Sequence, residues 1–190
     1  MRIVFLLPLL VAIATGVAAK PKPQSLGKTG GTMPRSMTLT PLASADGSIL
    51  GTVRLLQEAG GTRVVATIKG LPAGEYAIHV HAVGACTGPD FASAGGHFNP
   101  AMRQHGAMNP AGSHMGDLPN IVVAARGDGF TDGGIDAVRP DLRLRDGTMP
   151  LFDADGAAVV VHAKADDYRT DPTGNAGARL LCGVVAPPLK

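Results

Sequence analysis

Aromatic side chains are scarce in this sequence: 4% of its 190 residues are Phe, Tyr or Trp, and tryptophan is absent. A hydrophobic core must therefore be filled by Val, Leu, Ile and Ala, and few rings are present on which nucleic-acid bases could stack. A surplus of positive charge is also missing, because 17 Lys and Arg face 15 Asp and Glu. The sequence lacks the basic excess of a nucleic-acid-binding protein, and we expect no nucleic-acid partner.

Long hydrophobic runs are confined to the first residues. Residues 1–19 begin with a positive charge at Arg2, continue with an apolar stretch, and end in the small residues Val-Ala-Ala. This pattern predicts a secretory signal peptide that is cut after Ala19. The run is shorter than the ~20 residues that cross a bilayer, and no second run follows. We therefore expect no membrane span and an exported protein, in the periplasm or outside the cell.

The charge is unevenly distributed after this segment. Residues 20–35 are rich in Pro and Gly and carry four basic residues and no acid. A solvated linker is the simpler interpretation of this arm; a tether to a membrane or a polyanion is the alternative. Of the 17 basic residues, five precede residue 36, which leaves 12 against all 15 acids in residues 36–190. We predict a signal peptide (1–19), a basic arm (20–35) and one mildly acidic domain (36–190).

Only two cysteines are present, Cys86 and Cys182. In an exported protein an even number predicts one disulfide, and two buried free thiols are the alternative. A bond between residues 96 positions apart would stabilise the fold by about 4 to 5 kcal/mol in the loop-entropy model. It would staple the two ends of the domain together.

Strand patterns dominate the rest of the chain, and no sustained amphipathic helix is present. Seven β-branched or alternating runs predict strands at residues 37–42, 48–57, 62–68, 75–81, 120–125, 157–161 and 179–185. Gly60-Gly61 predicts a tight hairpin between the second and third runs. Residues 82–120 and 164–177 are rich in Gly, Pro, Asp and Asn, which predicts two long loops on a β-sandwich or barrel. Loops of this length are usually functional or held by something else.

The histidines suggest what holds these loops. All six lie beyond the first three predicted strands: His79, His81, His97, His105, His114 and His162. Two residues apart on a strand, the first pair leaves the same face, although such a pair alone is usually a half-exposed strand face. The next three histidines lie within 21 residues of loop together with Asp117, which predicts a tetrahedral His₃Asp zinc site.

Six histidines and one aspartate are too many ligands for one zinc ion. They fit two ions if one histidine is shared between them. Imidazole suits copper and zinc equally, but an all-nitrogen tetragonal set favours Cu(II), so the strand pair His79 and His81, with His162 at the end of another strand, would take copper.

The spacing of several motifs resembles the secreted bacterial copper/zinc superoxide dismutases over residues 36–186. The matching segments are His79-Val80-His81, Gly95 to Pro100, His105-Gly106, His114 to Leu118, Val161-His162, Asp166-Asp167, Thr173 to Arg179, and Cys182 to Val185. This resemblance implies an all-β, Greek-key β-sandwich or flattened eight-stranded barrel with two long functional loops. Both monomers and homodimers occur in this kind of fold.

The resemblance also implies a complete set of site residues. Copper would be held by His79, His81, His97 and His162, and zinc by His97, His105, His114 and Asp117. His97 would bridge the ions as an imidazolate, and Asp166 would accept hydrogen bonds from His79 and His105. Cys86 and Cys182 match the family disulfide, and Arg179 matches its anion-guiding arginine.

The implied activity is superoxide dismutation, with copper cycling between Cu(II) and Cu(I) and zinc as a structural and electrostatic partner. Superoxide is the expected substrate, and His97 and Arg179 are the expected catalytic residues, the first because it leaves Cu(I) and takes up a proton. The alternative is an exported copper- or zinc-binding or copper-delivery protein of the same fold without dismutase activity. A purely structural β-sandwich whose loops are held by zinc would leave His79, His81 and His162 without a role. A hydrolase is not indicated either, because the sequence contains no Gly-x-Ser-x-Gly motif.

Overall fold

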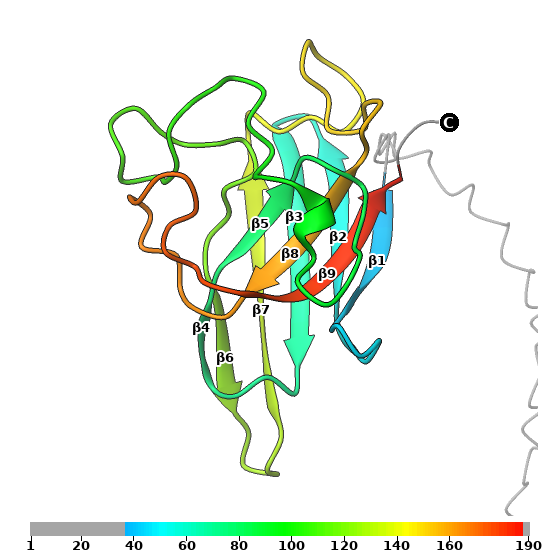
Figure 1. Cartoon of the computed structure of the whole chain (residues 1–190), viewed down its shortest axis with the longest axis vertical. Helices are drawn as coiled ribbons and strands as arrows, with labels where there is room; N and C mark the ends of the chain where they lie inside the picture. The colour runs from blue at the N-terminus through cyan, green and yellow to red at the C-terminus, as the bar shows by residue number, and fades with distance from the viewer. Residues whose placement is uncertain (1–36, 188–190) are drawn as a thin grey trace, which may run out of the picture. The chain divides into compact units, whose positions relative to one another are not determined.

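Nine β-strands and one short 3₁₀ helix form the computed structural model of the chain, which describes residues 37–187 (Figure 1). The predicted signal peptide and basic arm lie outside the described residues. The elements are β1 (Met37–Ala43), β2 (Ile49–Glu58), β3 (Gly61–Lys69), β4 (Gly74–Tyr76), β5 (Ile78–His81), η1 (Ala92–Ala94), β6 (Ile121–Ala125), β7 (Thr131–Arg139), β8 (Ala157–His162) and β9 (Arg179–Ala186). The predicted all-β fold is confirmed.

The strands pair in the order β4-β6-β7-β3-β2-β1-β9-β8-β5, and every ladder is antiparallel. Four neighbouring pairs, β4 with β6, β3 with β7, β1 with β9, and β5 with β8, are far apart in sequence. These long-range pairs bend the sheet into a flattened, nearly closed barrel. Among the described residues no helix has the length and hydrophobicity to span a membrane.

Side-chain alternation in β2 and β3 supplies one wall of the core. Val53 and Leu55 of β2 and Val64, Ala66 and Ile68 of β3 are buried, and the residues that alternate with them are more exposed. The two strands join in the tight hairpin predicted at Gly60, with Glu58 paired to Gly61. The core therefore lies between this wall and the buried strand β8, whose six residues are all buried.

The predicted strand 75–81 is two strands in the structure, β4 and β5. The break is at the buried Ala77: Tyr76 pairs with Ile121 of β6, whereas Ile78 pairs with Val161 of β8. The chain thus crosses between two parts of the sheet at this point. Counted as one run, β4 and β5 give the eight strands expected.

Strand β7 is the one strand that the sequence did not predict. Its glycines, Gly133 and Gly134, suggest a loop because glycine is unfavourable inside strands. In the structure a Cβ at either glycine would collide with a neighbouring backbone carbonyl, that of Val122 or that of Ala66. The glycines permit close approach of β6 and β3 to β7, a requirement that only the assembled sheet shows.

Both predicted loops are present, and they lie next to each other in Figure 1, residues 82–120 in green and residues 163–178 in orange. The first contains only η1, and the second contains no regular element. The first carries four of the seven expected metal ligands, His97, His105, His114 and Asp117, and the second carries Asp166.

Candidate metal centre

Strand β5 is the base of the site. His79 and His81 lie on it, both almost fully buried, and β5 pairs with β8, which ends at His162. The loop 82–120 returns alongside β5: Val80 donates its N–H to the Gly116 carbonyl, and Phe98 donates to the Val80 carbonyl. His97 and Asp117 are thereby brought opposite His81 and His79.

Four imidazoles converge at the end of β5 and β8. One ring nitrogen from each of His79, His81, His97 and His162 lies within 4.8 Å of the others, and all four residues are buried. The Nε2 atoms of His81 and His162 are 3.4 Å apart. This is a nitrogen-only ligand set of the kind that suits copper.

A second group surrounds the Asp117 carboxylate. Its Oδ1 lies 3.0 Å from Nδ1 of His97, 3.0 Å from Nδ1 of His105 and 3.3 Å from Nδ1 of His114. The His97 and His114 Nδ1 atoms are themselves 3.4 Å apart. A tetrahedral ion with bonds of about 2.0 to 2.1 Å separates its ligands by roughly 3.3 Å, so these four atoms have the spacing of a zinc site.

Three buried imidazole nitrogens lack hydrogen-bond partners within residues 37–187: His79 Nδ1, His97 Nε2 and His105 Nδ1. An unsatisfied buried polar atom costs about 1 to 3 kcal/mol, so such atoms call for a partner. Each of the three belongs to one of the two groups just described, and a coordinated ion would satisfy it. The residues present therefore fit copper and zinc.

Asp166 links the histidine group to the Asp117 group by accepting a hydrogen bond from one histidine of each. Its Oδ2 accepts a hydrogen bond of 2.9 Å from Nε2 of His79, and its Oδ1 accepts one of 2.9 Å from Nε2 of His105. A ring that donates from Nε2 has its lone pair on Nδ1, so both rings present their ligand atoms inward. The side chain of Asn120, which the sequence did not single out, holds Asp166 in turn by hydrogen bonds to the backbone N–H and carbonyl of that residue.

The protonation states suit metal binding. Burial lowers the pKa of His81 to about 2, that of His162 to about 3 and that of His97 to about 4. Burial also opposes charging of His105, but the Asp117 carboxylate, 3.0 Å from its Nδ1, and the hydrogen bond of its Nε2 to Asp166 prevail and raise its pKa to about 9. Burial raises the pKa values of Asp117 and Asp166, but their histidine partners lower these pKa values by more. At neutral pH His81, His97 and His162 are thus neutral imidazoles and Asp117 and Asp166 are charged carboxylates, the forms that coordinate metals, whereas His105 has to release a proton when it binds an ion.

Arg179, the first residue of β9, lies beside the histidine group. Its Nη1 donates to the Phe91 carbonyl at 2.6 Å, and its Nη2 donates to the Gly95 carbonyl at 2.7 Å. The same Gly95 carbonyl accepts a hydrogen bond of 2.9 Å from Nδ1 of His81. Burial lowers the pKa of Arg179, yet an arginine keeps its charge at neutral pH. Arg179 and His81 thus share the Gly95 carbonyl as acceptor, which places a fixed positive charge close to His81.

Gly174 shows how tightly the second loop covers the site. Its φ is +65°, and a Cβ there would overlap the Asp166 carboxylate and lie 2.6 Å from Nε2 of His105. Gly177 has a similar φ of +76°, but a Cβ there would only contact the flexible side chain of Lys164. A substitution at Gly177 therefore adds backbone strain alone, whereas one at Gly174 adds strain and also places a side chain in the site.

We expect Gly174→Ala to loosen the metal site far more than Gly177→Ala. The second substitution adds only the strain of a left-handed alanine, about 1 to 2 kcal/mol. Gly174→Ala adds the same strain and displaces Asp166, so thermal stability and zinc retention should both fall further. Melting temperatures and zinc loss to a chelator measure this, and equal behaviour of the two variants would contradict it.

The predicted disulfide is present. Cys86 and Cys182 are bonded, and no cysteine remains free, so the alternative of two free thiols is wrong. Cys86 lies in the loop 82–120 and Cys182 in β9. The bond therefore fastens the loop that carries His97, His105 and His114 to the barrel.

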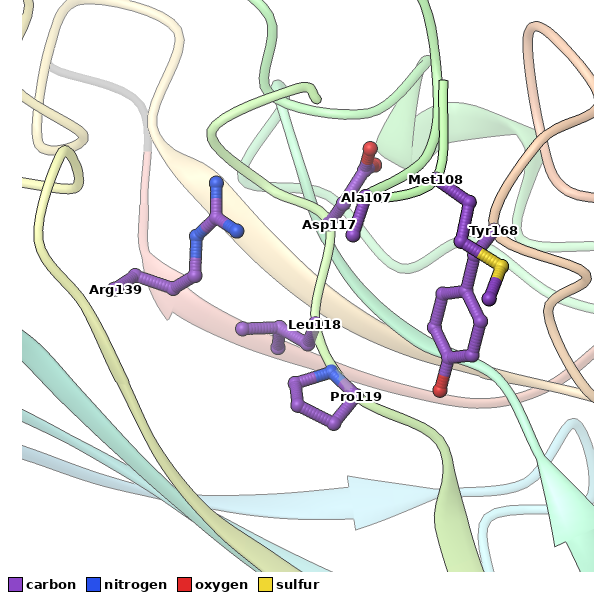
Figure 2. Close-up of a pocket in the computed structure, with 7 residues that line it drawn as sticks. All are labelled: Ala107, Met108, Asp117, Leu118, Pro119, Arg139 and Tyr168. Carbon is purple, nitrogen blue, oxygen red and sulfur yellow. The ribbon is translucent and has the colours of Figure 1, made fainter. Parts of the chain in front are cut away.

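A pocket of about 330 Å³ lies on the outer side of this loop, next to Asp117. Figure 2 shows Arg139 on one side of it and Met108 and Tyr168 on the other, with Leu118 and Pro119 between them. No histidine lines the pocket, which borders the second metal group only through Asp117. Tyr168 also matters to the site, because its hydroxyl accepts a hydrogen bond from the Asn120 N–H.

Comparisons with known proteins agree with this geometry. The family model for copper/zinc superoxide dismutases matches residues 49–185. The Cu-Zn superoxide dismutase 2 of Aquifex aeolicus is 40% identical over 146 residues, covering 76% of this chain and 83% of the relative. The Cu-Zn superoxide dismutase of Caulobacter vibrioides is 42% identical over 143 residues, covering 75% and 81%. A crystal structure of a superoxide dismutase-like protein from Bacillus subtilis superposes with a TM-score of 0.71 at 36% identity, covering 78% and 97%.

Proposed function

The chain belongs to the copper/zinc superoxide dismutase family, and from this premise we propose how its side chains divide two metal ions between them. It is an oxidoreductase that converts superoxide to oxygen and hydrogen peroxide with copper and zinc as cofactors. Copper takes His79, His81, His97 and His162, and zinc takes His97, His105, His114 and Asp117. The single observation that carries this division is the convergence of buried ligand atoms in two overlapping sets, one of His79, His81, His97 and His162 and one of His79, His97, His105 and Asp117, with His114 beside Asp117.

The two nitrogens of His97 support its role as the shared ligand. Its Nδ1 faces the Asp117 group at 3.0 Å, and its Nε2 is buried without a hydrogen-bond partner within the described residues. His79 also lies near the Asp117 group, but its Nε2 is bonded to Asp166, which leaves its free Nδ1 for copper. His114 contacts both His97 and Asp117, so it completes the zinc set.

When bound, copper supplies the one-electron oxidation and reduction of superoxide, and zinc, which has no other accessible oxidation state, does not. The chain supplies the rest. Asp166 fixes His79 and His105 in the tautomer that binds metal, and Arg179 attracts the superoxide anion toward His81. We propose that Nε2 of His97 holds a proton between the two halves of the cycle, because it faces the copper set and has no other partner there.

We expect Arg179→Ala to slow dismutation about tenfold, which corresponds to about 1.4 kcal/mol, with copper and zinc content unchanged. The guanidinium of Arg179 is half-buried, so little water screens its attraction for an anion. Exposed charges, in contrast, are screened within about 8 Å at physiological ionic strength. Arg169→Ala, at an exposed position of the loop 163–178, is the matched control and should stay within about twofold of the wild type.

Salt provides the second readout for Arg179. The wild-type rate should fall with added salt, and the rate of Arg179→Ala should fall less. Equal rates for the wild type and both arginine variants, at low salt and matched copper occupancy, would make Arg179 an ordinary surface charge.

The assay that tests the function compares the protein loaded with copper and zinc against the protein loaded with zinc alone. Dismutation in proportion to bound copper supports the proposed assignment. A protein that binds one copper and shows no dismutation would instead be a metal-binding or copper-delivery protein of the same fold.

We propose further that the protein is exported. The disulfide between Cys86 and Cys182 is consistent with an oxidising compartment. On this proposal residues 1–19 are removed, residues 20–35 are a solvated arm, and residues 36–190 form the exported domain as a monomer or homodimer. The intact mass and the location of the full chain after expression in a bacterium with a periplasm test this: a mass that begins at Lys20 is expected, and an uncut cytoplasmic protein would contradict it.

A further inference from the structure

Asp171, in the loop 163–178, contacts two residues of the zinc set. Its Oδ1 accepts a hydrogen bond of 2.5 Å from the backbone N–H of His105. The same oxygen lies 3.7 Å from Nε2 of His114, too far for a direct hydrogen bond but close enough for an electrostatic contact. Asp171 could not be singled out from sequence, because its partner His105 lies 66 positions away.

The carboxylate of the nearby Asp167 has a different set of partners. It accepts hydrogen bonds from the N–H groups of Arg169 and Thr170 and from the side chains of Thr170 and Asn175. All of these partners belong to its own loop. Two aspartates four residues apart thus have different tasks: Asp167 shapes the loop, and Asp171 reaches across to the loop that carries His105 and His114.

The two loops are packed closely where Asp171 bridges them. Met108 donates its N–H to the Tyr168 carbonyl at 3.0 Å, and Gly106 leaves no room for a Cβ against that carbonyl. Asp166 already orients the ring of His105 through Nε2. His114 has no such buried carboxylate behind it, and Asp171 is the acidic group that faces its Nε2 among the described residues.

We propose that Asp171 is a positioning residue for zinc, an inference that rests on the zinc set proposed above. Through the His105 N–H it fixes the backbone of one ligand. Through its charge it favours the His114 tautomer with hydrogen on Nε2, which leaves the lone pair on Nδ1, the atom that faces His97 and Asp117. Outer carboxylates of this kind change metal affinity by about 10- to 100-fold when they are removed.

Zinc release from the fully loaded protein to a chelator tests the proposal. Asp171→Ala removes both contacts and should speed zinc release about tenfold or more. Asp171→Asn keeps an oxygen that can accept from the His105 N–H but removes the charge beside His114, so its rate should lie between the wild type and the alanine variant. Asp167→Asn is the matched control, and its zinc release should stay within about twofold of the wild type even if the loop is less stable.

A spectroscopic readout separates positioning from a general loss of stability. Cobalt(II) in place of zinc reports ligand geometry through its visible absorption, which should change in both Asp171 variants and stay unchanged in Asp167→Asn. Zinc release and cobalt spectra equal to the wild type in Asp171→Ala would overturn the proposal, and so would equal changes in Asp167→Asn.

His114→Ala distinguishes this inference from the zinc assignment itself. If His114→Ala loses zinc rapidly and Asp171→Ala does not, only the positioning role fails. If His114→Ala retains zinc as the wild type does, the proposed zinc set is wrong, and the inference about Asp171 is overturned with it.

Discussion

Replacing His97 with alanine should abolish dismutation, with a loss of more than about 100-fold, and should weaken both metals at once. His97 is buried and faces Asp117 through Nδ1, and its Nε2 has no hydrogen-bond partner among the described residues, which leaves that nitrogen for the copper set. Its removal takes one ligand from each ion and the proposed proton-holding nitrogen from the site. Elemental analysis and copper electron paramagnetic resonance measure the two metals, and the dismutation assay measures activity.

His105→Ala is the control for His97→Ala. His105 belongs to the Asp117 group alone, so its loss should mainly loosen zinc while copper remains bound. A copper spectrum that is unchanged in His97→Ala would mean that this residue does not bridge. Identical losses of both metals in the two variants would mean that the two sets are not separable as proposed.

Loss of the bond between Cys86 and Cys182 should lower the free energy of unfolding by about 4 to 5 kcal/mol in the loop-entropy model, which corresponds to a melting temperature roughly 10 to 20 °C lower. The bond closes a long loop, with a sequence separation of 96, and it ties the loop 82–120 to β9. The loop should therefore also release its metals faster once the bond is broken.

The measurement compares melting temperatures and metal retention with and without a strong reductant, at equal metal content. The double variant Cys86→Ser with Cys182→Ser should resemble the reduced wild type and should not respond further to the reductant. An unchanged melting temperature in the reduced protein and in the double variant would refute the bond as a staple of the fold.

The residues that converge in the two groups could be predicted from the sequence because they are rare residue types with fixed spacing. Six histidines confined to one part of the chain, with Asp117 among them, are by themselves enough to indicate two joined ions. What spacing alone does not supply is the support around the ligands. Asn120 holds Asp166 across 46 positions of sequence and Tyr168 contacts Asn120 across 48, and a common polar residue carries no local sign of such a contact.

The fold was predictable where strands alternate buried and exposed residues, as β2 and β3 do. Strand β7 has two adjacent glycines, and its place in the sheet depends on how closely β3 and β6 approach it, which is a tertiary property. The break at Ala77 was missed for a related reason. A continuous strand pattern does not reveal that its two halves pair with different strands.

The most direct test of the central claim is the metal content of the folded protein after loading with copper and zinc and removal of loosely bound ions. Seven side chains with His97 shared provide four ligands for each of two ions, so elemental analysis should find one copper and one zinc per chain. Zinc alone after copper loading, or two ions of one kind with no preference between the sets, would contradict the division of ligands proposed for this site.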